Sequence, residues 1–165
     1  MNPFKTQIDQ FDEFRILRYQ VKDFDQLDLT TKKLIYYLSQ AALWGRDIIY
    51  DQNYRHNLLI RKTMEEIIQS DKIDKNTDAY QSFLIYTKKV FFANGVHHHY
   101  SMDKFFPKCS KEYFSQLLDR TDLNNLKEKY QIDAIEEFIM DIIFSEKDSK
   151  RVSLDTSGDL VKDSA

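Results

Sequence analysis

Three consecutive histidines followed by a tyrosine, His97 to Tyr100, are the grouping in this chain most suited to chemistry. They lie in the stretch "FANGVHHHYSMDKFFP" (92–107), and the whole chain has only four histidines. Imidazole rings bind metals and exchange protons near neutral pH. His97 and His99 would point the same way only in an extended segment, which gives two metal ligands, and no acid at helical spacing supplies a third. The pattern therefore favours loop histidines that hydrogen-bond to backbone or neighbours over a metal site.

Other catalytic arrangements have weaker support. The chain has no His-Glu-x-x-His element for an open zinc site, no glycine-rich phosphate cradle and no Gly-x-Ser-x-Gly elbow. Asp47 and Asp51 are spaced like a carboxylate pair on one helix face, but Arg46 beside them favours a structural ion pair. The single cysteine, Cys109, is interpreted as structural, because nothing nearby in the sequence would lower the pKa of its thiol.

Helices must position these residues. Few prolines or glycines interrupt the chain, and apolar residues recur with the helical period. The sequence predicts an all-α protein, an irregular array of about five to six helices. Residues 1–145 form the helical portion, and residues 146–165 form an extended or disordered tail. Helices are expected within 30–49, 57–69, 77–95, 110–118 and 133–144, while "FRILRYQV" (14–21) fits a helix or a strand.

Several local features of these helices are predicted. The helix within 30–49 is apolar around almost its whole circumference, which is typical of the middle of a core. Gly95 suits the left-handed position beyond the end of the third helix. Ser110 is expected to cap the fourth helix, and Asp133 with Glu136 resembles a capping box at the start of the last one.

Two solvent-side ion pairs are expected on the second helix. Arg61 should pair with Glu65 and Lys62 with Glu66, since each pair has the i, i+4 spacing.

Composition limits the partners and the compartment. The chain has 165 residues and a net charge of -3, so it offers no basic field for nucleic acid. The N-terminus lacks the basic and apolar regions of a signal peptide, and no apolar run is long enough to span a bilayer. With one cysteine suited to a reducing compartment, these features predict a soluble, cytoplasmic protein with no nucleic-acid or membrane partner.

Three segments carry a resemblance to a known family. They are "LRYQVKDFDQLDLTTKKLIYYLSQAALWGRDIIYDQNYRHNLLIRK" (17–62), "VFFANGVHHHYSMDKFFP" (90–107) and "KRVSLDTSGDLVKDSA" (150–165). The first two resemble the N-terminal region of bacterial members of the dipeptidyl peptidase III family of zinc peptidases, and the third resembles the stretch that follows in the same proteins.

The resemblance implies part of one lobe of a larger two-lobed enzyme that releases dipeptides from peptide N-termini. The family binds zinc through a His-Glu-x-x-Gly-His helix and a downstream glutamate helix, and neither is present in this sequence. Zinc is therefore expected in the complete enzyme and not in this chain. The expected partners are the peptide substrate and the remainder of the same polypeptide, and the isolated chain is expected to be inactive.

Within this interpretation, the histidine segment supports the lobe, and it could also line the peptide cleft. Loops held by rigid helices are common places for binding groups. The candidate substrate-binding residues are Asn94, Gly95, His97, His99 and Tyr100, and no residue is assigned a catalytic role. Two alternatives remain open: a free-standing helical protein-binding module without catalysis, and a divalent metal site on His97 and His99.

Overall fold

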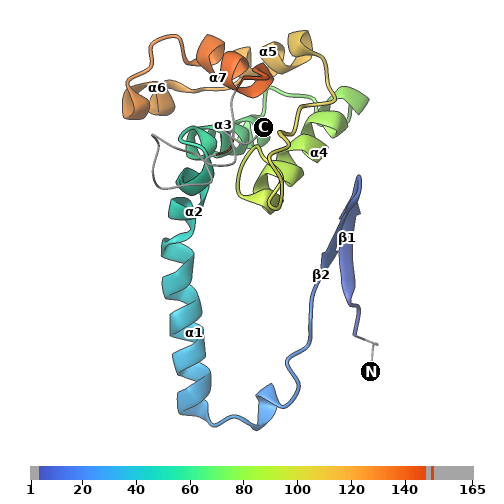
Figure 1. The fold of residues 1–165 in the computed structure, drawn as a ribbon, viewed down its shortest axis with the longest axis vertical. Coiled ribbons are helices and arrows are strands. Elements are labelled where there is room, and N and C mark those ends of the chain that lie inside the picture. The colour runs from blue at the N-terminus through green and yellow to red at the C-terminus, as the bar shows by residue number, and fades with distance from the viewer. Residues whose placement is uncertain (1–3, 148–149, 151–165) are drawn as a thin grey trace, which may run out of the picture. The chain divides into compact units, whose positions relative to one another are not determined.

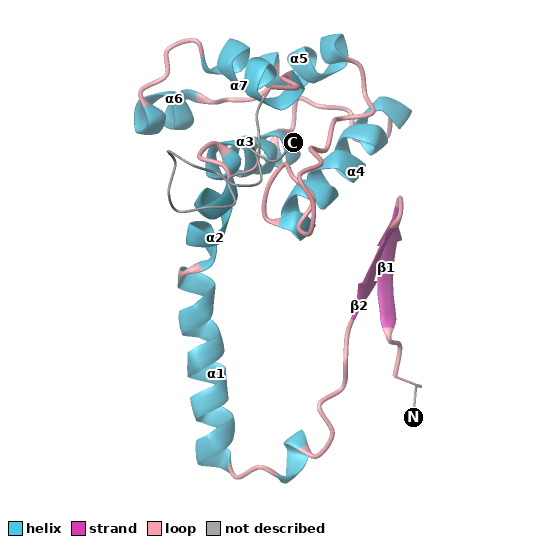
Figure 2. Cartoon of the chain, in the orientation of Figure 1, coloured by secondary structure: helices cyan, strands magenta, loops and turns pink. Residues whose placement is uncertain are grey.

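The structure, a computed structural model, describes residues 4–147 and 150. Within them it contains seven α-helices, one short 3-10 helix and one pair of strands, so the predicted multi-helix all-α class is confirmed (Figures 1 and 2). The chain divides into two compact units, Met1–Asp47 and Ile48–Ala165, which we describe separately. Most of the predicted tail, 146–165, lies outside the described residues.

The first unit begins with a β-hairpin. Strands β1 (Gln7–Phe11) and β2 (Phe14–Leu17) pair antiparallel, with an irregularity between Gln7 and Asp9. Phe11 and Phe14 face each other across the turn with stacked rings 5.7 Å apart. The undecided segment 14–21 therefore begins as a strand. The partner strand was not anticipated, because its polar sequence, QIDQF, has little strand character.

The helix expected in the core is almost entirely exposed in the structure. After the short helix η1 (Phe24–Gln26), α1 runs from Leu29 to Trp44, and none of its residues is buried. The prediction of a buried helix over 30–49 was wrong on this point. An apolar circumference indicates that a helix needs a cover, but it does not show that the described residues supply one.

The ends of α1 have clear local causes. The Asp28 carboxylate accepts hydrogen bonds from the Thr31 backbone N–H (3.0 Å) and hydroxyl (2.6 Å), which caps the helix. These bonds, the hydroxyl bond foremost, lower the pKa of Asp28. At the other end Gly45 stops the helix, and α2 begins at Arg46, so the expected single helix is two.

The second unit is a helical array around one core. Its remaining helices are α2 (Arg46–Asn53), which starts at the unit boundary, α3 (Asn57–Gln69), α4 (Asp78–Ala93), α5 (Lys111–Asp119), α6 (Asn124–Tyr130) and α7 (Ile135–Phe144). Helix α3 packs against α4 and α6, and α5 packs against α7. Helix α6 was not predicted, because only Leu126 of its seven residues is buried and the apolar period is too short to detect.

The predicted apolar stripes form this core. Each of α3, α4, α5 and α7 contributes side chains with no exposed surface: Ile60, Met64, Ile67, Phe83, Val90, Phe114, Ile135, Ile139 and Ile143. Phe83 meets Phe114 edge to face at 5.8 Å, and Phe114 meets Phe144 at 5.7 Å. Aromatic pairs with this geometry join α4, α5 and α7 at the centre of the unit.

The helix caps agree only in part with expectation. Thr77 and Ser110 accept hydrogen bonds from the backbone N–H groups of Tyr80 and Tyr113, both at 3.1 Å, and the Ser110 cap on α5 is the one predicted. Asn94, rather than Gly95, takes the left-handed position after α4, with φ 56° and ψ 37°. Asparagine adopts this conformation more readily than most residues, because its short amide forms local hydrogen bonds.

The predicted capping box on α7 does not form. Its N-cap is Ala134, and no side-chain cap bond is present. Glu136 instead pairs with Lys127 of α6 at 2.8 Å. A carboxylate in the first helical turn is still favoured by the helix dipole.

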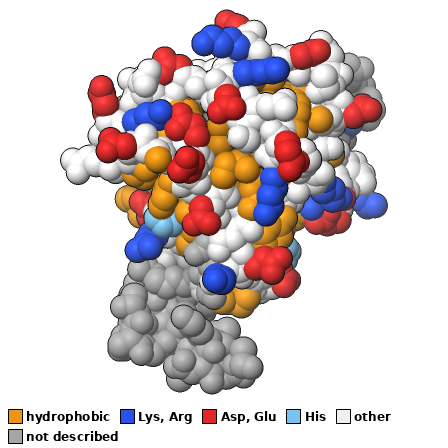
Figure 3. Space-filling model, turned by 90° about the horizontal axis from the view of Figure 1, so that it is seen from above, with side chains coloured by type: hydrophobic (Ala, Val, Ile, Leu, Met, Phe, Trp, Pro, Cys, Tyr) orange, Lys and Arg blue, Asp and Glu red, His pale blue; other side chains and the backbone are white. Residues whose placement is uncertain are grey.

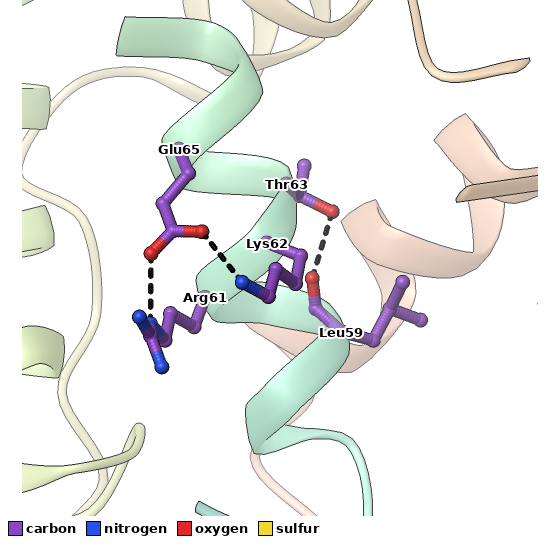
Figure 4. A network of polar contacts seen from close by, with 5 residues as sticks. All are labelled: Leu59, Arg61, Lys62, Thr63 and Glu65. Carbon is purple, nitrogen blue, oxygen red and sulfur yellow. Dashed lines mark hydrogen bonds and ion pairs between the residues drawn. The ribbon is translucent and has the colours of Figure 1, made fainter. Parts of the chain in front are cut away.

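One of the two ion pairs expected on α3 forms as predicted. The guanidinium of Arg61 lies 2.8 Å from the Glu65 carboxylate (Figure 4). Lys62 also pairs with Glu65, at 3.0 Å, and not with Glu66. Lysine reaches a residue three positions on as easily as four, so spacing alone could not choose between them.

Candidate functional site

The histidine segment forms a tight loop between α4 and α5. The N–H of Phe105 donates to the Val96 carbonyl at 2.7 Å, and the N–H of His98 donates to the Asp103 carbonyl at the same distance. His97 and Lys104 form an antiparallel bridge between them. The loop is therefore a short hairpin with its tip at residues 99–102.

A buried asparagine holds the base of this loop. Asn57, at the start of α3, is 1% exposed, and its side-chain oxygen accepts the Val96 N–H at 3.0 Å. Gly95 passes so close that an added Cβ would lie 2.3 Å from the Asn57 side-chain nitrogen. The N–H of Gly95 also donates to the Val90 carbonyl at 2.9 Å. Asn94 and Gly95 therefore shape the loop, and the close approach requires a residue without a side chain at position 95.

The three histidines have different environments. His97 is 3% exposed and packs edge-on against the Tyr54 ring at 5.5 Å. His98 is half-buried, and its Nδ1 accepts the Tyr100 N–H at 3.3 Å. His99 is exposed. Because the chain folds back at the loop tip, His97 and His99 are not presented together to solvent.

The loop tip carries a cluster of aromatic rings. The His99 ring stacks on that of His98 at 4.6 Å, meets that of Tyr100 at 4.1 Å and contacts Phe92 edge-on at 5.7 Å. Tyr100 is 89% exposed. His99 and Tyr100 are thus the predicted site residues that can reach a ligand directly, while Asn94, Gly95 and His97 lie beneath them as support.

Two lysines join the loop to the end of α7. The Lys104 ammonium donates to the carbonyls of Ile142 (2.7 Å) and Ser145 (2.6 Å), at the C-terminal end of α7, where carbonyls lose their helical partners. The Lys150 ammonium donates to the carbonyls of His98 (2.9 Å), His99 (3.1 Å) and Ser101 (3.4 Å). Hydrogen bonds from a charged donor are stronger than neutral ones, so Lys104 ties the loop to the end of α7 and Lys150 ties it to the segment that follows.

These contacts affect the charge of His99. Partial burial, then the neighbouring His98 and Lys150, lower the pKa of its imidazole below the ordinary value. The ring is therefore neutral at physiological pH and offers both a donor and an acceptor nitrogen.

A second surface feature is an open groove of about 1300 Å³ between α5 and α7. Its apolar lining comes from Ala134, Met140 and Phe144, and its acidic lining from Asp119, Glu136, Glu137, Asp141 and Glu146. Figure 3 looks onto this end of the unit and shows charged side chains of both signs among hydrophobic ones. Burial alone would raise the pKa of Glu136, but hydrogen bonds from Lys127 and its own backbone lower it.

A zinc site is not built by the described residues. Among them, no group of three or more His, Cys, Asp or Glu side chains is arranged to hold a metal ion. Cys109 is buried, and this burial raises the pKa of its thiol to about 11, which favours the unreactive protonated form. Within the same part of the chain, no helix is long and apolar enough to cross a bilayer.

Comparison with known proteins leaves the family unassigned. No protein-family model matches the chain. No curated protein matches it either. Function is therefore inferred from the sequence resemblance and from the geometry of the site.

Three residues of the site were not identified from the sequence. Asn57 is buried although its position in the sequence only marks a helix start, and Lys104 and Lys150 act on carbonyls 38 to 52 residues away. Lysine is abundant and usually solvated, so no local signal distinguishes these two. The buried role of Asn57 depends on contacts that only the fold creates.

Proposed function

We propose that this chain is the N-terminal, non-zinc part of a zinc-dependent dipeptidyl peptidase that releases dipeptides from peptide N-termini. It contributes helices to one lobe and is inactive by itself. The remainder of the same polypeptide is its principal partner, the substrate is a peptide, and the compartment is cytoplasmic. The support is the resemblance of three segments, of which the longest, 17–62, contains the whole of α1.

The observation that carries this proposal is the exposed apolar surface of α1. Large side chains along it are exposed: Leu29, Leu34, Ile35, Tyr36, Tyr37, Leu38, Leu43 and Trp44. Each would bury substantial apolar area, so together they form a surface on the order of 1,000 Å², above the few hundred Å² usual for a free monomer. A helix of this composition requires a protein cover, and the proposal assigns that cover to the remainder of the enzyme.

In this proposal, the zinc ion and its chemistry belong to the remainder of the polypeptide. This chain supplies a wall of the peptide cleft. His99 and Tyr100 offer a neutral imidazole and a phenol to the substrate backbone, and both groups can donate and accept hydrogen bonds. Asn94, Gly95 and His97 hold the loop that presents them.

A free-standing binding module is the second candidate. It is favoured by the second unit, whose helices enclose their own core of fully buried side chains. A module of this kind should leave only small exposed patches. The surface of α1 does not meet that expectation, so we rank this candidate below the first.

Zinc content and peptidase assays on the purified chain test the first proposal. The 165-residue chain should retain no stoichiometric zinc and should not cleave a dipeptidyl arylamide. Robust zinc-dependent cleavage by this chain alone would overturn the assignment.

Dye binding and gel filtration separate the two candidates. The peptidase fragment should bind a hydrophobic dye and self-associate as concentration rises, and replacing Tyr37, Leu38 and Trp44 with serine should reduce both effects. A monodisperse chain that binds no dye would favour the free-standing module.

A further inference from the structure

The carbonyl oxygens at the tip of the histidine loop form a receptor for an ammonium group. Those of His98, His99 and Ser101 converge on the single nitrogen of Lys150, at 2.9, 3.1 and 3.4 Å. A primary ammonium has three N–H donors and no acceptor. Three carbonyls around one nitrogen therefore match its hydrogen-bonding capacity.

The loop is held in this shape by bonds that do not involve Lys150. The His98 N–H donates to the Asp103 carbonyl at 2.7 Å, and the Ser101 hydroxyl donates to the Asp103 carboxylate at 2.7 Å. The Asp103 N–H in turn donates to the Ser101 hydroxyl oxygen at 3.2 Å. Since these bonds fix the turn, the three carbonyls should remain oriented when Lys150 is replaced.

Aromatic groups lie on this turn and beside it. Tyr100 is 89% exposed, His99 is exposed, and Phe92, against which His99 packs, is 42% exposed. Rings beside a cation site attract the cation and provide apolar contact for the group that carries it. The turn thus combines an ammonium receptor with a surface for an adjoining hydrophobic side chain.

We propose that the loop tip, through the carbonyls of His98, His99 and Ser101, binds the primary ammonium group of a ligand in competition with Lys150. Two sources share this chemistry: the free N-terminus of a peptide and the side chain of a lysine in another protein. Binding of a peptide N-terminus rests on the proposed peptidase function, whereas binding of an ammonium group at the loop tip does not. Lys150 acts as an internal competitor that occupies the receptor in the absence of ligand.

The test is a titration of the 165-residue chain with small ligands, in which NMR monitors binding. It is done at pH 6.5, where an α-amino group is protonated. The probes are phenylalaninamide, N-acetylphenylalaninamide, which has no ammonium, and Nα-acetyl-lysinamide, which has only a side-chain ammonium. They are applied to the natural chain, to Lys150→Met and to the matched control Lys147→Met, whose ammonium forms no bond to the loop among the described contacts.

We expect Lys150→Met to bind phenylalaninamide at least about tenfold more tightly than the natural chain, because removing a bound competitor raises the fraction of receptor that is open. Lys147→Met should bind like the natural chain. Lys150→Arg should show a smaller gain, since the guanidinium still fills the receptor. Shifts should be largest at residues 98–101, and the acetylated amide should not bind.

Equal affinity of Lys150→Met for phenylalaninamide and N-acetylphenylalaninamide would overturn the proposal. So would an affinity for phenylalaninamide no higher than that of the natural chain, provided that Lys150→Met has an unchanged thermal melt. If Lys150→Met unfolds, Lys150→Arg is compared with the natural chain instead, and no gain in its affinity for phenylalaninamide would overturn the proposal. Tighter binding of Nα-acetyl-lysinamide than of phenylalaninamide assigns the receptor to lysine side chains. If the loop binds ammonium groups but the longer polypeptide has no peptidase activity, the receptor proposal stands and the peptidase function is rejected. If the longer polypeptide is an active peptidase but the loop binds no ammonium group, the peptidase function stands and the receptor proposal is rejected.

Discussion

At the scale of single residues, the contact between Gly95 and Asn57 decides whether the histidine loop forms. Asn57 holds the Val96 N–H, and Gly95 leaves no space for a side chain between them. A buried N–H that loses its acceptor costs about 1–3 kcal/mol. The loop that carries His99 and Tyr100 therefore depends on two residues at its base.

Replacing Gly95 with alanine should lower the free energy of unfolding by about 1–3 kcal/mol, because the new Cβ would collide with the Asn57 amide. Urea denaturation measures this loss. Gly45→Ala is the matched control: its nearest neighbour is 3.7 Å away and its φ is -83°, so it should be neutral or slightly stabilising. Equal effects of the two substitutions would contradict the account of the loop.

Cys109 provides a second residue-scale prediction. Burial raises the pKa of its thiol to about 11, so only a small fraction is thiolate at pH 8. Its reaction with a disulfide reagent should be slow in the folded chain at pH 8 and fast after urea unfolding. Rapid modification of the folded chain at neutral pH would show that the thiol is accessible and activated.

The charge of His99 should respond to Lys150. Replacing Lys150 with methionine removes one of the causes that lower the pKa of the imidazole, so this pKa should rise toward its ordinary value. NMR titration of the ring protons measures the change, with Lys147→Met as the control. A pKa that stays the same in both variants would show that Lys150 does not lie beside this ring.

At the scale of elements, α1 and the core helices should respond differently to the same substitution. Leu38 of α1 is 61% exposed, whereas Leu117 of α5 is 2% exposed. Leu38→Ala should change the free energy of unfolding by less than about 0.5 kcal/mol, and Leu117→Ala should cost about 2–5 kcal/mol. A loss of that larger size for Leu38→Ala would mean that α1 is packed within the isolated chain.

Sequence patterns predicted the elements well where one helix face is apolar. The helix over 57–69 was located to the residue, and the stripes of α3, α4 and α7 became the core, because burial of one face produces the helical period. The same pattern failed for α1, where apolar residues surround the helix and indicate a cover without identifying it. It also missed β1 and α6, which bury too little apolar surface to leave a period.

The sequence predicted where the candidate site lies along the chain, but not how its side chains are arranged. The histidines and the end of α4 identified the loop between α4 and α5. The separation of buried His97 from exposed His99, and the roles of Asn57 and Lys150, depend on contacts between distant parts of the chain. No local spacing in the sequence encodes such contacts.

At the scale of the whole molecule, the two units have different requirements. The helices of the second unit enclose a core, whereas α1 in the first unit presents apolar side chains with none buried. An apolar surface of this extent favours association with another protein surface. The proposed larger polypeptide would supply such a surface for α1, whereas the second unit already has a core of its own.

The most direct test compares zinc-dependent release of dipeptides by two purified proteins: this 165-residue chain, and the polypeptide encoded by its complete reading frame. The account predicts that the longer polypeptide binds zinc and cleaves a dipeptidyl arylamide, that a chelator abolishes this activity, and that the 165-residue chain shows neither property. Zinc-dependent cleavage by the 165-residue chain alone, or none by the longer polypeptide loaded with zinc, would contradict it.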